Sequence, residues 1–208
     1  GGSLLLSNNI LNVGQGCLGE GPHMATLDLS GLDNLTLQQA RVYVAGGGTA
    51  ALRGLAGTLL LARTNLLTLT GATPTFLVGD NGAGAGTTNI SVVLLGQTNI
   101  IFSDSMVVGG RKQSASLSFN PSFSSPNLYL RKDSTGARAT LLGVGDAGFT
   151  SITGSSSTTN VMDLSAGTSD IMANTVYVGR TAQVASAHAG MTGTLTMGAG
   201  TLDVNTLE

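Results

Sequence analysis

The chain is poor in the residue types that build disulfides, metal clusters and charged surfaces. Of its 208 residues one is cysteine and none is tryptophan, while aromatic residues make up 4% and charged residues 10%. The single Cys17 excludes an internal disulfide and a cysteine-ligated metal cluster. A net charge of −2 offers no basic surface for nucleic acid. Apolar runs such as residues 92–95 are too short to cross a membrane, so we expect no membrane insertion.

Groups that could carry catalysis are equally scarce. The two histidines, His23 and His188, belong to no nucleophile motif. Glu20 and Glu208 are the only glutamates, and the nine aspartates are scattered along the chain. Polysaccharide lyases and glycosidases need carboxylates clustered on one face, so a polysaccharide-processing enzyme is the least favoured function. We expect no catalytic residue, no cofactor and no metal site.

Glycine is abundant, at 31 residues, and its arrangement has two interpretations. The spacing Gly14-x-Gly16-x-x-Gly19 is that of a dinucleotide-binding turn, which requires a helix directly afterwards. Here Pro22 and a strand-like segment follow, and the same spacing returns at residues 143–148. These glycines are therefore interpreted as corners of a repeated β structure.

One short phrase recurs six times along the chain. It ends in a valine, at Val13, Val44, Val78, Val108, Val144 and Val178, with successive steps of 31, 34, 30, 36 and 34 residues. Alternation within each phrase predicts a strand with two inward residues and one outward residue between them. The expected inward pairs are Leu11/Val13, Val42/Val44, Phe76/Val78, Met106/Val108, Leu142/Val144 and Val176/Val178. The expected outward residues are Asn12, Tyr43, Leu77, Val107, Gly143 and Tyr177.

Two further ladders accompany this phrase and define the fold. Short alternating segments such as TLDLSG and TLTMGAG form one, and an Asn or Asp before an apolar residue marks the other. Three strands per roughly 33 residues predict a right-handed parallel β-helix (β-solenoid) of about six coils with three short sheets. Propeller blades need about 40–50 residues with aromatic signatures, and leucine-rich repeats need a helical segment, so both fit less well. We expect one segment over residues 1–208, part of a longer or polymerising chain.

The repeat also predicts individual neighbours. Asn34 is expected on an internal asparagine ladder. Asp146 and Arg180 hold the same repeat position in adjacent coils, which predicts a stacked surface ion pair. The longest coil contains prolines and a charged cluster, which predict a loop that projects from the shaft. Its candidate ligand-contact residues, with glycan as the possible ligand and a solvated insertion as the alternative, are Arg131, Lys132, Asp133 and Arg138.

The C-terminal quarter carries a family-like pattern. Residues 193–197 read GTLTM, residues 200–204 read GTLDV, and residues 206–208 begin another such step. This stretch resembles the autotransporter-associated β-strand repeats of large bacterial surface and secreted proteins. The match is good over residues 161–208 and looser upstream. The resemblance implies an extracellular or cell-surface scaffold and brings no catalytic residues with it.

These observations predict a non-catalytic extracellular structural protein. We expect a shaft or filament subunit whose open strand edges pair end to end with copies of itself, or with flanking repeats of the same chain. The alternative is an adhesin segment that binds glycan through loops on one face. An in-register row of aromatic or Asp/Asn side chains would favour that alternative, and the sequence shows none.

Overall fold

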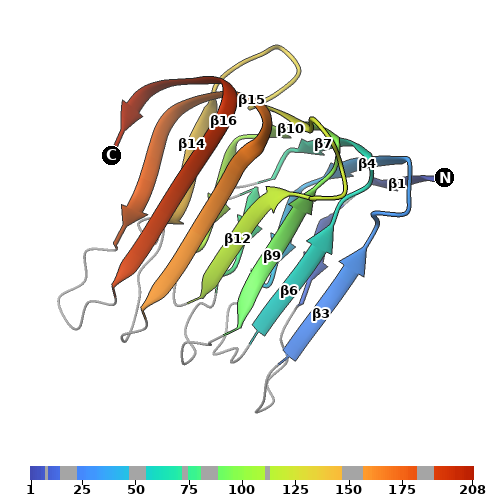
Figure 1. The fold of residues 1–208 in the computed structure, drawn as a ribbon, viewed down its shortest axis with the longest axis horizontal. Coiled ribbons are helices and arrows are strands. Elements are labelled where there is room, and N and C mark those ends of the chain that lie inside the picture. The colour runs from blue at the N-terminus through green and yellow to red at the C-terminus, as the bar shows by residue number, and fades with distance from the viewer. Residues whose placement is uncertain are drawn as a thin grey trace.

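The computed structural model describes residues 1–7, 9–14, 23–46, 55–71, 75–80, 89–110, 113–146, 157–181 and 190–208. Within these ranges the regular elements are all β-strands, paired in parallel. The chain winds into a β-solenoid in which each turn adds one strand to each of three ladders (Figure 1). The all-β solenoid that the repeat predicts is confirmed. Across the described part of the chain, no helix is long and apolar enough to span a membrane.

The three ladders run side by side along the solenoid. The first contains β3 (His23–Asp28), β6 (Leu55–Leu60), β9 (Ile90–Leu95) and β12 (Ser114–Phe119). The second contains β1 (Ser3–Ser7), β4 (Asn34–Gln39), β7 (Thr64–Leu69), β10 (Thr98–Ser103) and β13 (Asn127–Arg131). The third contains β2 (Ile10–Val13), β5 (Arg41–Val44), β8 (Phe76–Val78), β11 (Ser105–Val108) and β14 (Ala139–Asp146). The long strands β15 (Thr158–Arg180) and β16 (Met191–Leu207) run through all three and join them into one 16-stranded sheet.

The number of turns differs slightly from the prediction. Five steps of one strand spacing lead from β3 to the start of β16, so the solenoid makes about five turns rather than about six. The sequence count includes the phrase at Val13, which lies in β2. That first turn holds β1 and β2 but no described strand of the first ladder. Figure 1 places the two termini at opposite ends of the stack.

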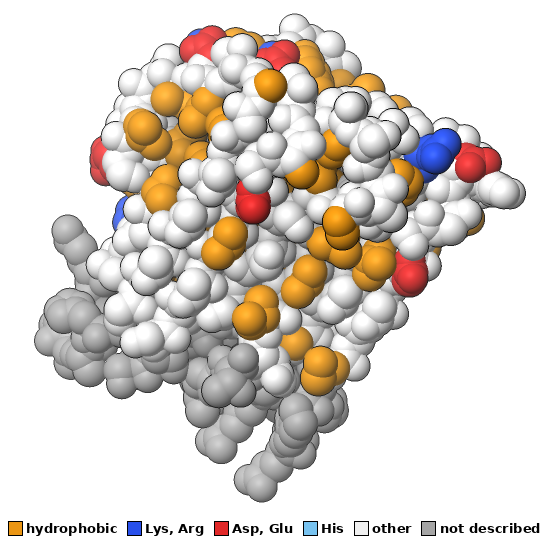
Figure 2. All heavy atoms as spheres, viewed as in Figure 1, with side chains coloured by type: hydrophobic (Ala, Val, Ile, Leu, Met, Phe, Trp, Pro, Cys, Tyr) orange, Lys and Arg blue, Asp and Glu red, His pale blue; other side chains and the backbone are white. Residues whose placement is uncertain are grey.

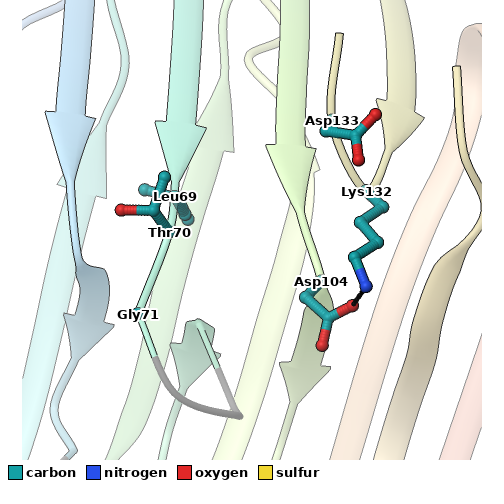
Figure 3. A pocket seen from close by; sticks show the side chains of 6 residues that line it. All are labelled: Leu69, Thr70, Gly71, Asp104, Lys132 and Asp133. Atoms are coloured by element: carbon teal, nitrogen blue, oxygen red, sulfur yellow. Dashed lines mark ion pairs between the residues drawn. The ribbon is translucent and has the colours of Figure 1, made fainter. Parts of the chain in front are cut away.

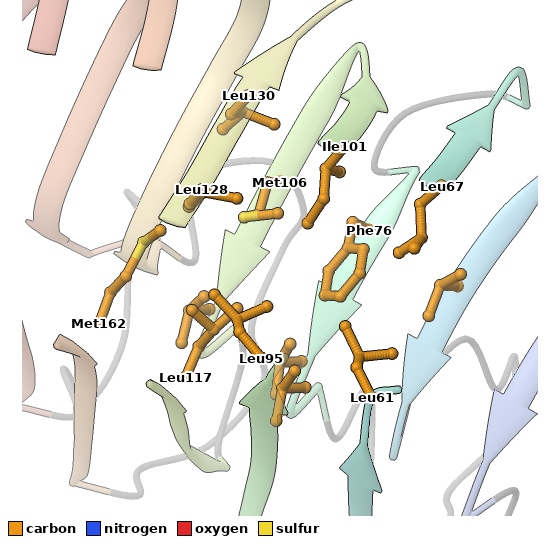
Figure 4. Close-up of a cluster of buried hydrophobic side chains, with 14 of the residues drawn as sticks. Leu61, Leu67, Phe76, Leu95, Ile101, Met106, Leu117, Leu128, Leu130 and Met162 are labelled. Carbon is orange, nitrogen blue, oxygen red and sulfur yellow. The ribbon is translucent and has the colours of Figure 1, made fainter. Parts of the chain in front are cut away.

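The interior is a single apolar column, because each ladder places like residues above one another. The phrase valines are paired in register from Val13 to Val178. All twelve predicted inward side chains lie in, or pack against, one core cluster, part of which Figure 4 shows. Fully burying a side chain such as Phe76 or Leu67 stabilises the fold by about 1.5–3 kcal/mol. The inward pairs are therefore confirmed.

The residue after each phrase valine turns the corner out of the third ladder. Five of these residues are glycines with a left-handed backbone, and the sixth is an alanine with the same geometry. They are Gly14, Ala45, Gly79, Gly109, Gly145 and Gly179, with φ angles of 81°, 53°, 69°, 81°, 64° and 80°. Because this conformation costs a residue with a Cβ about 1–2 kcal/mol, glycine is favoured there. The corner interpretation is confirmed for Gly14, whereas Gly16 and Gly19 lie outside the described residues.

One expectation about side-chain surroundings is wrong. Asn34 is exposed and pairs in register with Thr64, so it is not part of an internal ladder. The middle residues of the phrases point away from the core, as predicted, but several are covered rather than solvated. Tyr43, Leu77 and Val107 are buried and form a second small cluster, in which Leu141 is buried and against which Tyr177 packs.

Candidate functional site

Arg131 is the last residue of β13, and the other three predicted ligand-contact residues lie between β13 and β14, at the corner from the second to the third ladder. A tight loop holds them: the Lys132 amide donates to the Ala137 carbonyl at 2.8 Å. The Asp133 carboxylate accepts hydrogen bonds from the Thr135 hydroxyl and amide, and these bonds lower the pKa of Asp133. The loop is therefore ordered by its own hydrogen bonds and stays close to the solenoid.

Arg131 ties its own turn to the next one. Its guanidinium donates to the Asp170 carboxylate at 2.8 Å and to the Asp170 carbonyl at 3.0 Å. It also stacks on the Tyr129 ring, 4.2 Å from the ring centre, and its side chain is only 7% exposed. Charge-assisted pairs with fixed geometry of this kind hold two segments in register. The Arg131 guanidinium is therefore engaged by contacts within the fold and is not presented to solvent.

Arg138 makes a longer tie of the same kind. Its guanidinium donates to the Asp203 carboxylate at 2.6 Å and to the Asp203 carbonyl at 2.7 Å. Because Asp203 lies in β16, this contact links the corner before β14 to the last described turn, across β15. Two of the four predicted contact residues therefore serve the stacking of turns.

Lys132 and Asp133 line a shallow hollow of about 310 Å³ with Leu69, Thr70, Gly71 and Asp104 (Figure 3). The Lys132 ammonium lies 3.1 Å from the Asp104 carboxylate, to which the Thr140 hydroxyl also donates at 2.7 Å. The Lys132 side chain is 47% exposed, so this pair adds little to stability. Hydroxyl, carboxylate and ammonium groups side by side suit a polyhydroxylated ligand. Within the described ranges, no group of three or more His, Cys, Asp or Glu side chains could hold a metal ion.

The predicted pair between Asp146 and Arg180 forms, but it is not at the surface. Arg180 donates to both Asp146 carboxylate oxygens, at 2.6 and 2.8 Å, and the Asp146 side chain is 0% exposed. The guanidinium also lies over the Tyr177 ring, 3.4 Å from its centre. Burial acts to lower the pKa of Arg180, but the hydrogen bonds and charge of Asp146 outweigh it, and the pKa is raised. The prediction of a pair is confirmed, and its surface location is wrong, because the Asp146 side chain has no exposed surface and only the Arg180 side chain is partly exposed.

The two ends of the solenoid form the second candidate site. β16 pairs with β15 along one edge, and its other edge has no partner in the described part of the chain. At the opposite end β1, β2 and β3 each pair on one edge with a described strand. Edge strands are usually protected by Lys, Pro or a covering segment. The sequences of β1, β2, β3 and β16 contain no Lys, Arg or Pro.

Apolar interior is uncovered at both ends. The core-facing Leu27 is only partly buried, whereas Leu59 and Val93 at the same position of the next two turns are 0% exposed. At the other end the partly buried core residues are Leu195, Met197, Leu202 and Val204. Among the described residues, four of the six exposed large apolar side chains lie in strands at the two ends: Leu5, Ile10, Met24 and Leu207. These end faces are chemically suited to further β pairing.

The sides of the solenoid differ from its ends. Figure 2 shows the face over the first ladder, where apolar side chains are scattered among uncharged polar ones and acidic groups are few. Its outward rows mix small polar residues such as Thr58, Ser116 and Thr194 with apolar ones such as Val92 and Leu94. This face offers neither a charged patch nor a row of aromatic rings to a ligand.

Sequence reasoning missed the partners of the two arginines. Asp170 and Asp203 are 33 residues apart, one repeat, and each accepts from an arginine of an earlier turn. Their common repeat position was the available signal, but pairing them with Arg131 and Arg138 requires the register of β13, β15 and β16. Asp104 and Thr70 were missed because the corners that bring them to Lys132 belong to different turns.

Comparison with protein-family models, curated proteins and solved structures gives no match. The resemblance to autotransporter-associated repeats therefore rests on the motifs of residues 161–208 alone. In the structure the GTLTM and GTLDV motifs both lie in β16, which pairs with β15 through all three ladders.

Proposed function

We propose that the chain is a non-catalytic structural protein, a shaft or filament subunit that stacks end to end through its solenoid ends. The observation that carries the proposal is the last strand. β16 presents an edge over Met191–Leu207 with no Lys, Arg or Pro, and the part of the chain described here does not cover it. Such an edge is a template for a further parallel strand.

The geometry of the ends supports linear growth. Because every described ladder is parallel, the β16 edge of one copy and the β1 and β2 edges of the next can pair in the same sense. The two end faces are different surfaces, so the contact is head to tail and does not close on itself. Each added turn lengthens the shaft by about 4.8 Å. Burial of the partly exposed second-ladder residues Leu202 and Leu6 would add apolar stabilisation to the backbone pairing.

An extracellular or cell-surface location belongs to the same proposal. It is supported by the resemblance of residues 161–208 to surface-protein repeats and by a charged content of only 10%. The many short hydroxyl side chains allow adjacent turns to pack closely on the outside. Flanking repeats of the same chain could occupy the same end faces as a second copy.

The test is sedimentation velocity over a hundredfold concentration range, with negative-stain imaging of each fraction. We expect rods of constant width that lengthen with concentration. The variant Leu202→Lys places a charge on the paired part of the end face and should raise the concentration needed for growth by about tenfold or more. Thr194→Lys is the matched control, because Thr194 is exposed on the outer surface. A wild-type monomer at every concentration would refute stacking between copies.

A second candidate function, glycan binding, is favoured by the hollow beside Asp104. It would make the chain an adhesin segment rather than a shaft. A glycan array with the wild-type chain and with Lys132→Met tests it, and we expect about tenfold weaker binding for the variant. Lys132→Arg, which retains the charge, is the control. The candidate is abandoned if the wild-type chain binds no glycan or if both variants bind equally.

A further inference from the structure

The three ladders do not begin in the same turn. The first consists of β3, β6, β9, β12, β15 and β16, whereas the second and third each begin one turn earlier, with β1 and β2. At the other end all three ladders finish in β16. Within the described residues, the N-terminal face therefore has a step, in which β3 lies one strand spacing below its neighbours.

The step is confined to the strand position beside β3. The corner that follows β3 is already stacked, because the Gly2 carbonyl accepts hydrogen bonds from the Asp33 and Asn34 amides at 2.9 and 3.2 Å. Leu4 and Leu6 of β1 already pack against the core in the second ladder. Among the residues that the structure describes, none pairs with the remaining edge of β3, where Met24 is 72% exposed and Ala25 and Leu27 are only partly buried.

The same step appears in a head-to-tail junction. If β16 of one copy pairs with β1 and β2 of the next, the first-ladder part of β16 lies two spacings from β3, about 9.6 Å. That distance is too long for backbone hydrogen bonds and accommodates one extended strand. This role at a junction rests on the proposed function, whereas the step in the isolated chain does not.

We propose that the edge of β3 is an acceptor site for one extended peptide strand with the first-ladder pattern of this chain. The strand would run parallel to β3 over about six residues, the length of β3. Main-chain hydrogen bonds provide the affinity in this mode of recognition, and alternate side chains provide the specificity. An apolar side chain is required above Leu27 and a small one above Ala25.

The chain's own strands show what fits. Along the first ladder the position of Leu27 is taken by Leu59, Val93, Leu117, Met162 and Leu195. The position of Ala25 is taken by Gly57, Ser91, Ala115, Asn160 and Gly193. The glycine at 57 is required there, since a Cβ would lie 2.4 Å from the Val13 carbonyl oxygen. No large apolar residue takes this position in the described turns, and its largest occupant is Asn160.

A fluorescent peptide copying residues 192–199 (TGTLTMGA) is the probe, titrated with the full chain by fluorescence anisotropy. We expect saturable one-to-one binding. Leu27→Lys in the chain should weaken binding about tenfold or more, and Leu195→Lys in the chain should leave it unchanged. This pair of variants separates the β3 edge from the β16 edge, and circular dichroism checks that both remain folded. A peptide with lysine in place of its leucine should not bind.

Each outcome distinguishes the acceptor site from the stacking of copies. If the peptide binds the wild-type chain but not the Leu27→Lys chain, the acceptor site is supported. If the wild-type chain is also monomeric at every concentration, the proposed stacking is refuted. If rods form but no peptide binds, the acceptor site is overturned and stacking still holds. The acceptor site is also overturned if the peptide binds the Leu27→Lys chain as tightly as the wild-type chain, and that result does not bear on stacking. Where rods form, the peptide should lower the concentration needed for growth about tenfold, because it fills the step. A rise in that concentration would overturn the role at the junction.

Discussion

Gly79 and Ala45 occupy equivalent corners in successive turns, and at the scale of single residues they differ only by a methyl group. Gly79 has φ of 69°, and a Cβ there would lie 2.9 Å from the Ala115 Cβ. Ala45 already has φ of 53° in a buried corner. At Ala45 the fold accepts a strained backbone with a Cβ in place. At Gly79 a Cβ would meet the same strain and would also have no space.

We therefore predict that two reciprocal substitutions differ in their effect on the free energy of unfolding. Gly79→Ala should lower the free energy of unfolding by about 1–2 kcal/mol or more, because left-handed strain and a close contact add. Ala45→Gly should change it by less than about 1 kcal/mol, since relief of strain offsets the greater freedom of glycine in the unfolded chain. Urea denaturation of both variants measures the effect. An unchanged midpoint for Gly79→Ala would contradict the corner argument.

At the scale of elements, the corner between the first and second ladders depends on two stacked asparagines. The Asn99 side chain donates to the Gly96 and Asn127 carbonyls at 2.7 and 2.8 Å and accepts from the Asn65 side chain at 2.9 Å. Asn99 is 0% exposed, so its own amide group has no access to water and depends on these partners. These contacts fasten three successive turns at one corner.

Replacing Asn99 should therefore loosen the corner. We predict that Asn99→Ala lowers the free energy of unfolding by about 2–3 kcal/mol, because buried backbone carbonyls lose their donors. Asn34→Ala is the matched control and should change it by less than about 0.5 kcal/mol, since Asn34 is exposed. Both are measured by urea unfolding. Equal effects would mean that the ladder adds nothing to stability.

The same asparagines show how far sequence reasoning reaches. The repeat, the strand alternation and the inward phrase pairs are local patterns, and all of them could be predicted. The placement of Asn34 could not, because the structure pairs Leu35 with Asn65. A shift of one residue between strands reverses the side on which a side chain lies, and no local pattern reports that shift. The partners of Arg131 and Arg138 were missed for the same reason, since 39 and 65 residues separate them from their aspartates.

At the scale of the whole molecule, the solenoid behaves as a one-dimensional array in which each turn touches only its neighbours. Central strands such as β9 pair on both sides and enclose residues that are 0% exposed, including Val93 and Leu95. End strands pair on one side only and have exposed apolar side chains, among them Met24 and Leu207. Local opening should therefore require least free energy at the two ends.

Hydrogen exchange should detect both this gradient and its removal by stacking. At low concentration we predict that the amides of β16 and of β1–β3 exchange at least about tenfold faster than those of β9 and β10. At high concentration the end strands should gain protection while the centre stays unchanged, because new parallel pairing covers only the end faces. Mass spectrometry of peptic fragments at both concentrations provides the comparison, with the Leu202→Lys variant as the control that should not respond. Equal protection along the chain at low concentration would contradict the array. Protection gained in the central turns instead would mean that copies associate through the sides of the solenoid.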